Sequence, residues 1–347
     1  MITAMSTFRW QRWGRALVLI YLIGLLLWLI LRQLTGDRIL YMTLVNAGAI
    51  VLFSPLPLAL PIVWRWPDTR VRALWLTGLF AFLAFWGPLL VPGSGQSIPA
   101  DGQVRLLTYN AQGAQDEWDL AVDTIEAADA DIVALQEVTP ELAETIEVRL
   151  SDDYPYRFLA SEPGSSGMAL ISKIPFEVVQ HGLPTSWNGR PILARFDWQG
   201  QSFQLLTLHT WASGPSSREL FRWAIDARLE NFRFLEQQIP RWLEDGPLIV
   251  AGDFNITHLN EGYEEMTTHL RDAWREAGWG LGHTYPVSNV ADGPLALKYG
   301  IPVPQRLIRI DYVFVSDEWL LGSAEIAEYH GGGDHLGLVI EMALPAD

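Results

Sequence analysis

Apolar positions along the chain fall into two kinds of run. The first part holds three long runs without a charged side chain, and the remainder holds many short apolar runs separated by polar turns. A helix that spans a membrane needs about 20 apolar residues. We therefore expect residues 1–91 to form a transmembrane anchor, a bundle of about three transmembrane helices near 16–34, 39–63 and 71–91. Three prolines in the second run favour a kinked or re-entrant segment there.

Arginines flank these runs unevenly. Six of the eight lie before the first run or between the second and the third. The positive-inside rule then puts the N-terminus in the cytoplasm and, after three crossings, the rest of the chain on the extracytoplasmic side of the plasma (inner) membrane. If the second run does not cross, that side is reversed. A cleaved signal peptide is the alternative for the first run, but no small-residue cleavage site follows it.

The two parts of the chain differ in net charge. Residues 1–99 carry a net charge of +6, whereas residues 100–347 carry sixteen basic and thirty-eight acidic side chains, a net charge of −22. Residues 92–103 are rich in Gly, Pro and Ser and predict a linker. The chain has no cysteine, which excludes disulfides and thiolate metal sites.

Short strands and helices alternate over 104–347. Helical periodicity predicts helices over 117–130 and 140–150, and a long helix over 216–239 that prolines bracket. The remaining apolar runs are typical of buried strands. Many strands with few helices indicate one α/β domain with sheets in its middle.

Polar groups able to bind a metal ion or a phosphate stand at the ends of these apolar strands. Strand ends at one edge of packed sheets form a shared rim where side chains converge. Taken singly, each residue has an ordinary explanation, such as a turn former, a helix cap or a satisfied core histidine. An aspartate inside an apolar strand is harder to dismiss, because a buried carboxylate needs a partner. The set is Asn110, Glu137, His209, Asp253, Asn255, Asp311, Asp334 and His335.

Carboxylate, amide and imidazole groups without cysteine are typical of a Mg²⁺ or Mn²⁺ site. Attack of water on a phosphate ester needs a base for the water, a cation over the developing charge and donors to the non-bridging oxygens. The inventory of polar residues therefore predicts hydrolysis of a phosphate ester.

Seven segments, in this order, resemble the endonuclease/exonuclease/phosphatase superfamily, whose members include deoxyribonucleases, neutral sphingomyelinases and inositol-polyphosphate phosphatases. They are TYNAQG, DIVALQEV, GMALISKIPF, LLTLHT, LIVAGDFNIT, RIDYVFVS and GGDHLGLVIEM. The resemblance spans about residues 104–343. It implies a four-layered α/β sandwich, in which two central β-sheets are flanked by helices.

The resemblance also implies roles for these residues. Glu137 would be the principal metal ligand with Asn110 beside it, and Asp334 would complete the metal site. Asp253 would orient and deprotonate the attacking water, and Asn255 would hydrogen-bond the phosphate or the nucleophile.

The two histidines would contact phosphate oxygens or the leaving oxygen, and Asp311 would pair with His335 and hold its tautomer. Two long loops are expected to shape substrate recognition, and Tyr285 and Arg190 in them are the expected substrate-binding residues. The sequence departs from the family pattern at Gly333, where many members have Ser, and at Gln112, where some nucleases have an acidic residue.

Three functions are consistent with these features. The first is a membrane-anchored phosphodiesterase that acts on a lipid headgroup or lipid anchor at the bilayer. The second is a surface nuclease that acts on DNA or RNA, although the acidic domain counts against a polyanionic substrate. The third is a catalytically inactive binding module on a membrane stalk. The sequence leaves the oligomeric state open.

Overall fold

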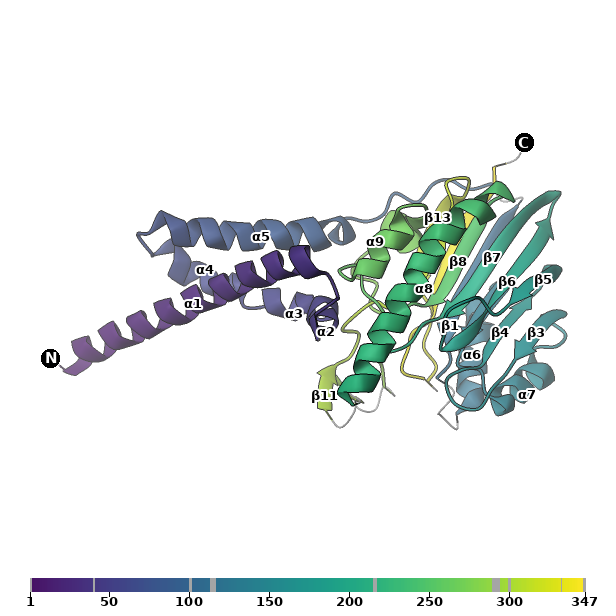
Figure 1. Cartoon of the computed structure of the whole chain (residues 1–347), viewed down its shortest axis with the longest axis horizontal. Helices are drawn as coiled ribbons and strands as arrows, with labels where there is room; N and C mark the ends of the chain where they lie inside the picture. The colour runs from purple at the N-terminus through teal and green to yellow at the C-terminus, as the bar shows by residue number, and fades with distance from the viewer. Residues whose placement is uncertain are drawn as a thin grey trace. The chain divides into compact units, whose positions relative to one another are not determined.

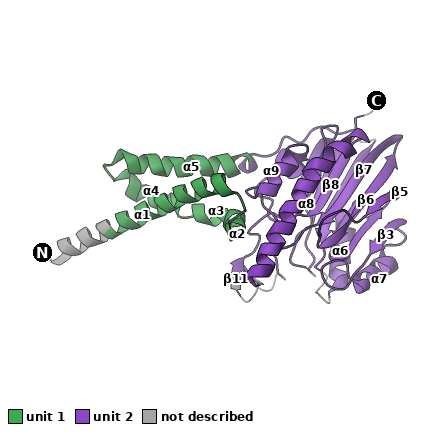
Figure 2. Cartoon of the chain, viewed as in Figure 1, with its two compact units in different colours: residues 1–88 green, residues 89–347 purple. Residues whose placement is uncertain are grey.

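The computed structural model describes residues 2–39, 41–99, 102–112, 117–214, 217–288, 294–298, 301–331 and 333–345. The chain divides into two compact units, residues 1–88 and residues 89–347 (Figure 2). Unit 1 is helical, and unit 2 holds the β-sheets (Figure 1).

Unit 1 contains two long helices, α1 (Ile2–Thr35) and α5 (Thr69–Leu90), and three short ones between them. The short helices are α2 (Met42–Ala47), α3 (Ala49–Phe53) and α4 (Leu56–Trp64). The rings of Trp28 and Phe53 pack edge to face with centroids 5.7 Å apart, and Phe53 also packs on Trp86 at 5.2 Å. These buried aromatic contacts join α1, α3 and α5.

Two stretches, Trp13–Thr35 and Thr69–Leu90, are long and apolar enough to span a membrane. The expected middle helix over 39–63 is instead broken into α2, α3 and α4, so a third spanning helix is not found among the described residues. Gly48 separates α2 from α3, and Pro55 separates α3 from α4. Proline lacks an N–H and clashes with the preceding turn, which explains the second break.

Unit 2 is built on two six-stranded sheets, whose strands follow in spatial order. The first sheet comprises β13 (Leu320–Ile326), β14 (Leu338–Ala343), β1 (Gln103–Asn110), β2 (Ile132–Gln136), β4 (Met168–Ser172) and β3 (Tyr156–Ala160). The second comprises β5 (Phe176–His181), β6 (Gly189–Trp198), β7 (Gln201–His209), β8 (Leu248–Asp253), β12 (Asp311–Val315) and β9 (Arg271–Asp272). A separate hairpin pairs β10 (Leu295–Lys298) with β11 (Ile301–Pro304).

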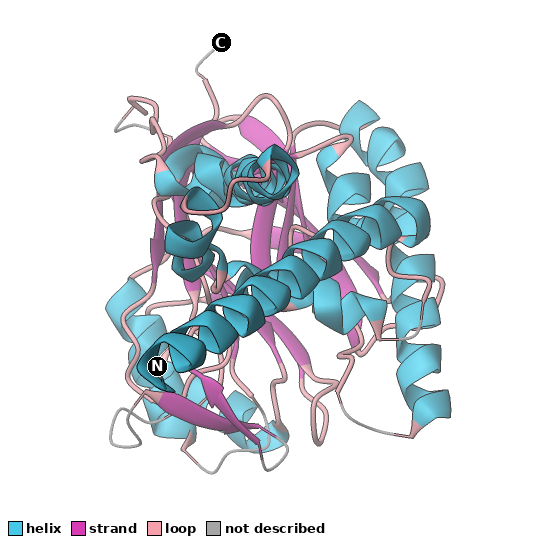
Figure 3. Cartoon of the chain, turned by 90° about the vertical axis from the view of Figure 1, so that its left-hand side faces the viewer, coloured by secondary structure: helices cyan, strands magenta, loops and turns pink. Residues whose placement is uncertain are grey.

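Helices cover the outer faces of both sheets, as Figure 3 shows. The helices α6 (Trp118–Ala128) and α7 (Pro140–Arg149) pack on the first sheet, and α8 (Arg218–Glu244) and α9 (Glu261–Thr267) pack on the second. A short helix, α10 (Ala273–Ala277), follows β9. The predicted four-layered sandwich is therefore confirmed.

Each sheet contains one parallel pair joined by a crossover helix. The pair β1–β2 is joined by α6, and the pair β7–β8 is joined by α8. Side chains alternate along these strands, so that Leu107 and Tyr109 pack toward α6 and α7, whereas Asn110 faces the opposite sheet. In β8, Val250 packs in the outer core and Asp253 faces inward. The carboxyl ends of four strands consequently meet at one edge.

Two further segments differ from the predicted bounds or character. The helix α8 continues through Pro240 to Glu244, because Ile239 and Trp242 are buried on its inner face and their burial offsets the hydrogen bond lost at the proline. The predicted linker forms no helix or strand between residues 92 and 99, but it belongs to unit 2 and is hydrogen-bonded to β13. Gln96 N donates to Leu321 O at 2.7 Å.

Candidate active site

Strand ends from both sheets supply the polar residues of the site. Asn110 ends β1, Glu137 follows β2, and His209 and Asp253 end the parallel strands β7 and β8, where they are register partners. Asp311 begins the antiparallel strand β12 directly opposite Asp253. The sequence-predicted convergence of these residues is thus seen in the fold.

Asn110 links the two sheets. Its amide nitrogen donates to Glu137 Oε1 at 3.2 Å and to Asp253 Oδ2 at 3.0 Å. Its Oδ1 accepts from Gln112 N at 3.0 Å, so the side-chain orientation is fixed from both ends. One amide nitrogen therefore holds two carboxylates from opposite sheets side by side.

Asp253 is a buried carboxylate with few compensating partners. It is 1% exposed, and burial raises its pKa from the ordinary range to about 7, while the positive charge of His335 acts in the opposite direction. The preceding residue must be glycine, because Gly252 has φ +147° and a side chain there would overlap the carbonyl of Leu208. A carboxylate with a pKa near neutrality is suited to general-base chemistry.

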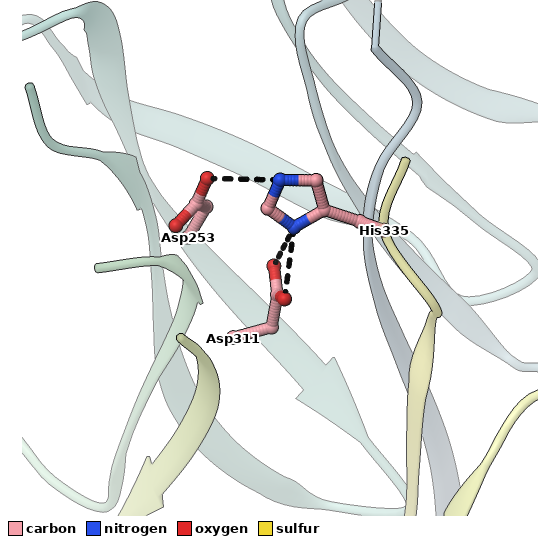
Figure 4. A group of neighbouring side chains, drawn as sticks. All are labelled: Asp253, Asp311 and His335. Atoms are coloured by element: carbon pink, nitrogen blue, oxygen red, sulfur yellow. Dashed lines mark hydrogen bonds and ion pairs between the residues drawn. The ribbon is translucent and has the colours of Figure 1, made fainter. Parts of the chain in front are cut away.

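His335 lies against two aspartates, as Figure 4 shows. Its Nδ1 is 3.0 Å from Asp311 Oδ2 and 3.2 Å from Oδ1, and its Nε2 is 3.8 Å from Asp253 Oδ2. Burial alone would lower the pKa of His335, but Asp311 and Asp253 together raise it to about 9. The imidazole is therefore a cation at neutral pH, with its tautomer and orientation set by Asp311.

One potential ligand atom from each of Asp253, Asp311 and His335 lies within 4.8 Å of the others. Both oxygens of Asp311 already face His335 Nδ1. We therefore interpret Asp311 and His335 as a hydrogen-bonded dyad and not as metal ligands. This agrees with the role that the sequence resemblance implied for them.

His209 is buried beside the carboxylates, with Nε2 3.5 Å from Asp253 Oδ2 and 3.8 Å from Glu137 Oε1. Burial and the nearby charge of His335 lower the pKa of His209 to about 3, so its ring is neutral. The amide nitrogen of Asn188 lies 3.3 Å from its Nδ1. Sequence reasoning missed Asn188, which stands just before β6 in the "SWNGR" segment and is not at the end of an apolar run.

Asn255 departs from the geometry that strand alternation predicts. The strand β8 ends at Asp253, and Asn255 adopts a left-handed conformation with φ +50°. Its N–H donates to Asp253 Oδ1 at 2.9 Å, and its side-chain amide donates to Thr210 O at 3.0 Å. Asn255 thus braces the Asp253 carboxylate. Glu137 is also left-handed, with φ +59°, and such conformations cluster at functional sites.

A second group of residues borders His335. The ring of Tyr285 lies 4.8 Å from the ring of His335, and Lys298 Nζ lies 5.1 Å from the centroid of Tyr285. Lys298 also forms an ion pair with Asp334, which the sequence resemblance assigned to the metal site. Burial lowers the pKa of Lys298 to about 8, although Glu137 acts to raise it. Sequence reasoning did not single out Lys298.

Arg190 is not brought to this cluster. It is exposed, and its guanidinium donates to the backbone oxygen of His181 at the end of β5. Arg190 itself lies on β6, next to Gly189, the register partner of His209, but its side chain is turned toward β5. Tyr285, the other expected substrate-binding residue, does lie at the site.

Comparison with known proteins identifies the family. The profile described as the Endonuclease/Exonuclease/phosphatase family matches residues 107–335. The chain belongs to this family. Its members are hydrolases that act on phosphate esters and use divalent metal ions. A search of curated proteins found no match.

Solved structures with the same fold include three that align with this chain over nearly the whole of their own length. The structure of D. rerio TDP2 complexed with a single-strand DNA product is 19% identical, covers 70% of this chain and 99% of its own, and has a TM-score of 0.52. The Bacteroides vulgatus family member is 20% identical, with coverage of 70% and 99% and a TM-score of 0.52. The human Nocturnin catalytic domain with bound sulfate is 20% identical, with coverage of 72% and 96% and a TM-score of 0.50.

The donor set of this endonuclease/exonuclease/phosphatase family member fits a divalent cation. The carboxylates of Glu137 and Asp253 both accept a hydrogen bond from the amide nitrogen of Asn110. Like charges held this close favour a bound cation, and carboxylate and amide oxygens are the ligands that Mg²⁺ and Mn²⁺ prefer. Glu137 would hold the ion, with Asn110 beside it.

Proposed function

We propose that this protein is a membrane-anchored, divalent-metal-dependent phosphodiesterase in which Asp253 activates the attacking water. The observation that carries the proposal is the double hydrogen bond of Asn110 to Glu137 and Asp253. That contact joins Glu137, a candidate metal ligand from the first sheet, to Asp253, a candidate base from the second. A binding module without activity has no need of a buried carboxylate with a raised pKa.

Asp253, His335 and Asp311 account for the proton transfer. Asp253 accepts a proton from the attacking water, whose oxygen bonds to phosphorus while the bond from phosphorus to the leaving oxygen breaks; the leaving oxygen takes its proton from solvent. The N–H of Asn255 binds Oδ1 of Asp253, and Oδ2 faces the site. His335, kept cationic by Asp311, donates from Nε2 to an oxygen of the phosphoryl group as negative charge develops there. His209 and Asn188 line the same side and supply neutral polar contacts.

A divalent ion at Glu137 and Asn110 would supply additional charge stabilisation at the phosphoryl oxygens when bound. Mg²⁺ and Mn²⁺ both suit an oxygen-rich donor set. The chain's own contribution is to hold Glu137 in its left-handed conformation and to fix Asn110 through Gln112 N. These contacts position the two ligands before substrate arrives.

The membrane anchor is supported by the outward face of α1. Leu17, Ile20 and Leu34 are 66%, 68% and 75% exposed, which is costly in water and favourable in hydrocarbon. The proposal places unit 2 on the extracytoplasmic side of the plasma membrane, which requires the α2–α4 segment to complete a third crossing. Protease treatment of intact cells tests this: protection of unit 2 would show that it faces the cytoplasm.

A lipid headgroup or lipid anchor is the proposed substrate class, because anchoring raises the local concentration of the site at the bilayer and the acidic unit 2 repels polyanions. A nucleic-acid substrate is the second candidate. It is favoured by the fold shared with D. rerio TDP2, which was solved with a single-strand DNA product.

The decisive experiment is hydrolysis of bis-p-nitrophenyl phosphate across a Mg²⁺ or Mn²⁺ titration. We expect the wild-type chain to be active only with the ion, and Glu137→Gln to lose about 10²-fold in rate or to need far more metal. Glu177→Gln is the matched control, because Glu177 is exposed on β5. Metal-independent activity, or equal metal dependence of wild type and Glu137→Gln, would contradict the proposal.

Phospholipid vesicles and plasmid DNA offered to the same preparation separate the two substrate classes. We expect release of a phosphorylated headgroup from the vesicles and little nicking of the plasmid. Cleavage of the plasmid with intact lipid would instead establish the nuclease.

A further inference from the structure

The hairpin β10–β11 lies outside both sheets, yet its base is hydrogen-bonded into the active site. Leu307 N donates to Tyr285 O at 2.9 Å, and Arg306 N donates to Pro286 O at 2.7 Å. The segment 284–287, to which the hairpin is bonded, also binds the residues on either side of His335. Val287 N donates to Asp334 O at 2.9 Å, and Leu336 N donates to Thr284 O at 2.9 Å. These bonds hold the hairpin against the site.

Lys298 is the last residue of β10, and it reaches the site from this hairpin. Its ammonium group is paired with Asp334 and lies 5.1 Å from the ring centroid of Tyr285. The Tyr285 ring in turn packs on His335. The Lys298 side chain is 18% exposed. The cation therefore has one anionic partner and one aromatic partner, both beside the proposed position of the phosphoryl group.

The charges around the site indicate a role for Lys298. Four carboxylates surround the position, and a phosphodiester adds another negative charge; they belong to Glu137, Asp253, Asp311 and Asp334. His335 Nδ1 faces both carboxylate oxygens of Asp311. An anionic ester that enters this site is repelled by these carboxylates. A cationic side chain that reaches the ester lowers this repulsion, in addition to His335 and the proposed metal ion.

We propose that Lys298 is a substrate-binding residue whose ammonium group binds a non-bridging oxygen of the phosphoryl group in place of Asp334. The inference rests on the proposed function, since it takes the substrate to be a phosphate ester. Tyr285 keeps the ammonium near the site during the exchange, because the cation–π contact does not involve Asp334. The lysine assists binding of the ester, while Asp253 performs the proton transfer.

Inorganic phosphate is the probe, and its affinity is measured by calorimetry on the full chain at a fixed Mg²⁺ concentration. We expect Lys298→Met to weaken phosphate binding about tenfold, since a charge-assisted hydrogen bond is lost. The KM for bis-p-nitrophenyl phosphate should rise by a similar factor, while kcat changes less than about threefold. Lys298→Arg should retain most of the affinity, because it keeps the charge.

The chain offers a closely matched control in Lys173. This lysine also pairs with an aspartate, Asp129, and also lies over a tyrosine ring, Tyr154, at 5.6 Å. It follows β4 at the end remote from the site. Lys173→Met should bind phosphate like the wild type, so an effect confined to Lys298 reports the site and not the loss of an ion pair in general.

Unchanged phosphate affinity in Lys298→Met, or a wild-type chain that binds no phosphate, would overturn the inference. Lys298→Gln serves as a second variant if the methionine variant fails to fold. Because phosphate binding needs no turnover, the outcome is separable from the proposed function. A chain that binds phosphate through Lys298 but hydrolyses no ester would reject the proposed function and leave the phosphate site standing.

Discussion

Two aspartates of the second sheet are buried to nearly the same extent and are compensated in opposite ways. Asp253 is 1% exposed and Asp272 is 4% exposed. Asp272 receives two hydrogen bonds from Arg309, at 2.8 and 2.6 Å, and one from Tyr263 at 2.9 Å. Asp253 has no such cationic fork: it accepts from the amide of Asn110 and the N–H of Asn255, and His335 Nε2 lies 3.8 Å away.

The pKa values follow from these surroundings. Burial acts to raise both, but Arg309 holds the pKa of Asp272 below its ordinary value, whereas the pKa of Asp253 is raised to about 7. A fully paired carboxylate stabilises the fold, and a carboxylate left short of partners is reactive. The comparison shows that burial alone does not mark a catalytic residue, and that the number and charge of its partners do.

The largest effect on stability is expected at the paired aspartate. Asp272→Asn should lower the free energy of unfolding by about 3–5 kcal/mol, because Arg309 is left buried without its counter-ion. Its side chain also accepts from Trp274 N at the start of α10. Thermal or denaturant unfolding measures the loss, with Asp152→Asn as the exposed control. The folded fraction should hydrolyse the ester at nearly the wild-type rate.

If Asp272→Asn had the same free energy of unfolding as the wild type, the stabilising role of the paired aspartate would be contradicted. Loss of hydrolysis from fully folded Asp272→Asn would be equally damaging, since it would give catalytic importance to the fully paired carboxylate.

A smaller effect, on rate and its pH dependence, is expected at His335. Hydrolysis needs Asp253 ionised and His335 protonated, so the rate should rise as pH passes about 7 and fall as it passes about 9. His335→Gln should lower the rate about 10²-fold and remove the alkaline fall. It should also move the acid limb to higher pH, because the positive charge of His335 lowers the pKa of Asp253.

The pH–rate profile of His335→Gln is compared with that of His269→Gln, a histidine outside the site. An alkaline fall that persists unchanged in His335→Gln would show that another group carries it. Such a result would contradict the assigned role of His335 as the proton donor.

The strand-end positions of the polar residues could be predicted from the sequence, because a period of two in a buried strand sets the facing of each side chain. Thus Leu208 packs outward and His209 inward, and the strand ends of two sheets could be expected to meet. Helices α6 and α7 were likewise predicted within two residues, since their apolar faces and the Pro140 start signal are local features.

Other features depend on contacts that no local pattern reveals. Asn255 leaves the strand period because its backbone turns left-handed and its amide bonds Thr210. Lys298 reaches the site through a hairpin whose position is set by distant backbone bonds. The pairing of Asp272 with Arg309 spans 37 positions, so the difference between the two buried aspartates could not be predicted from the chain alone.

The central claim is that Asp253 activates water, and Asp253→Asn tests it most directly. The rate of metal-dependent hydrolysis of bis-p-nitrophenyl phosphate is measured alongside the melting temperature. We predict a loss of about 10²–10⁴-fold in rate with an unchanged or higher melting temperature, because a poorly compensated buried charge is removed. Wild-type activity in a folded Asp253→Asn chain would contradict the account.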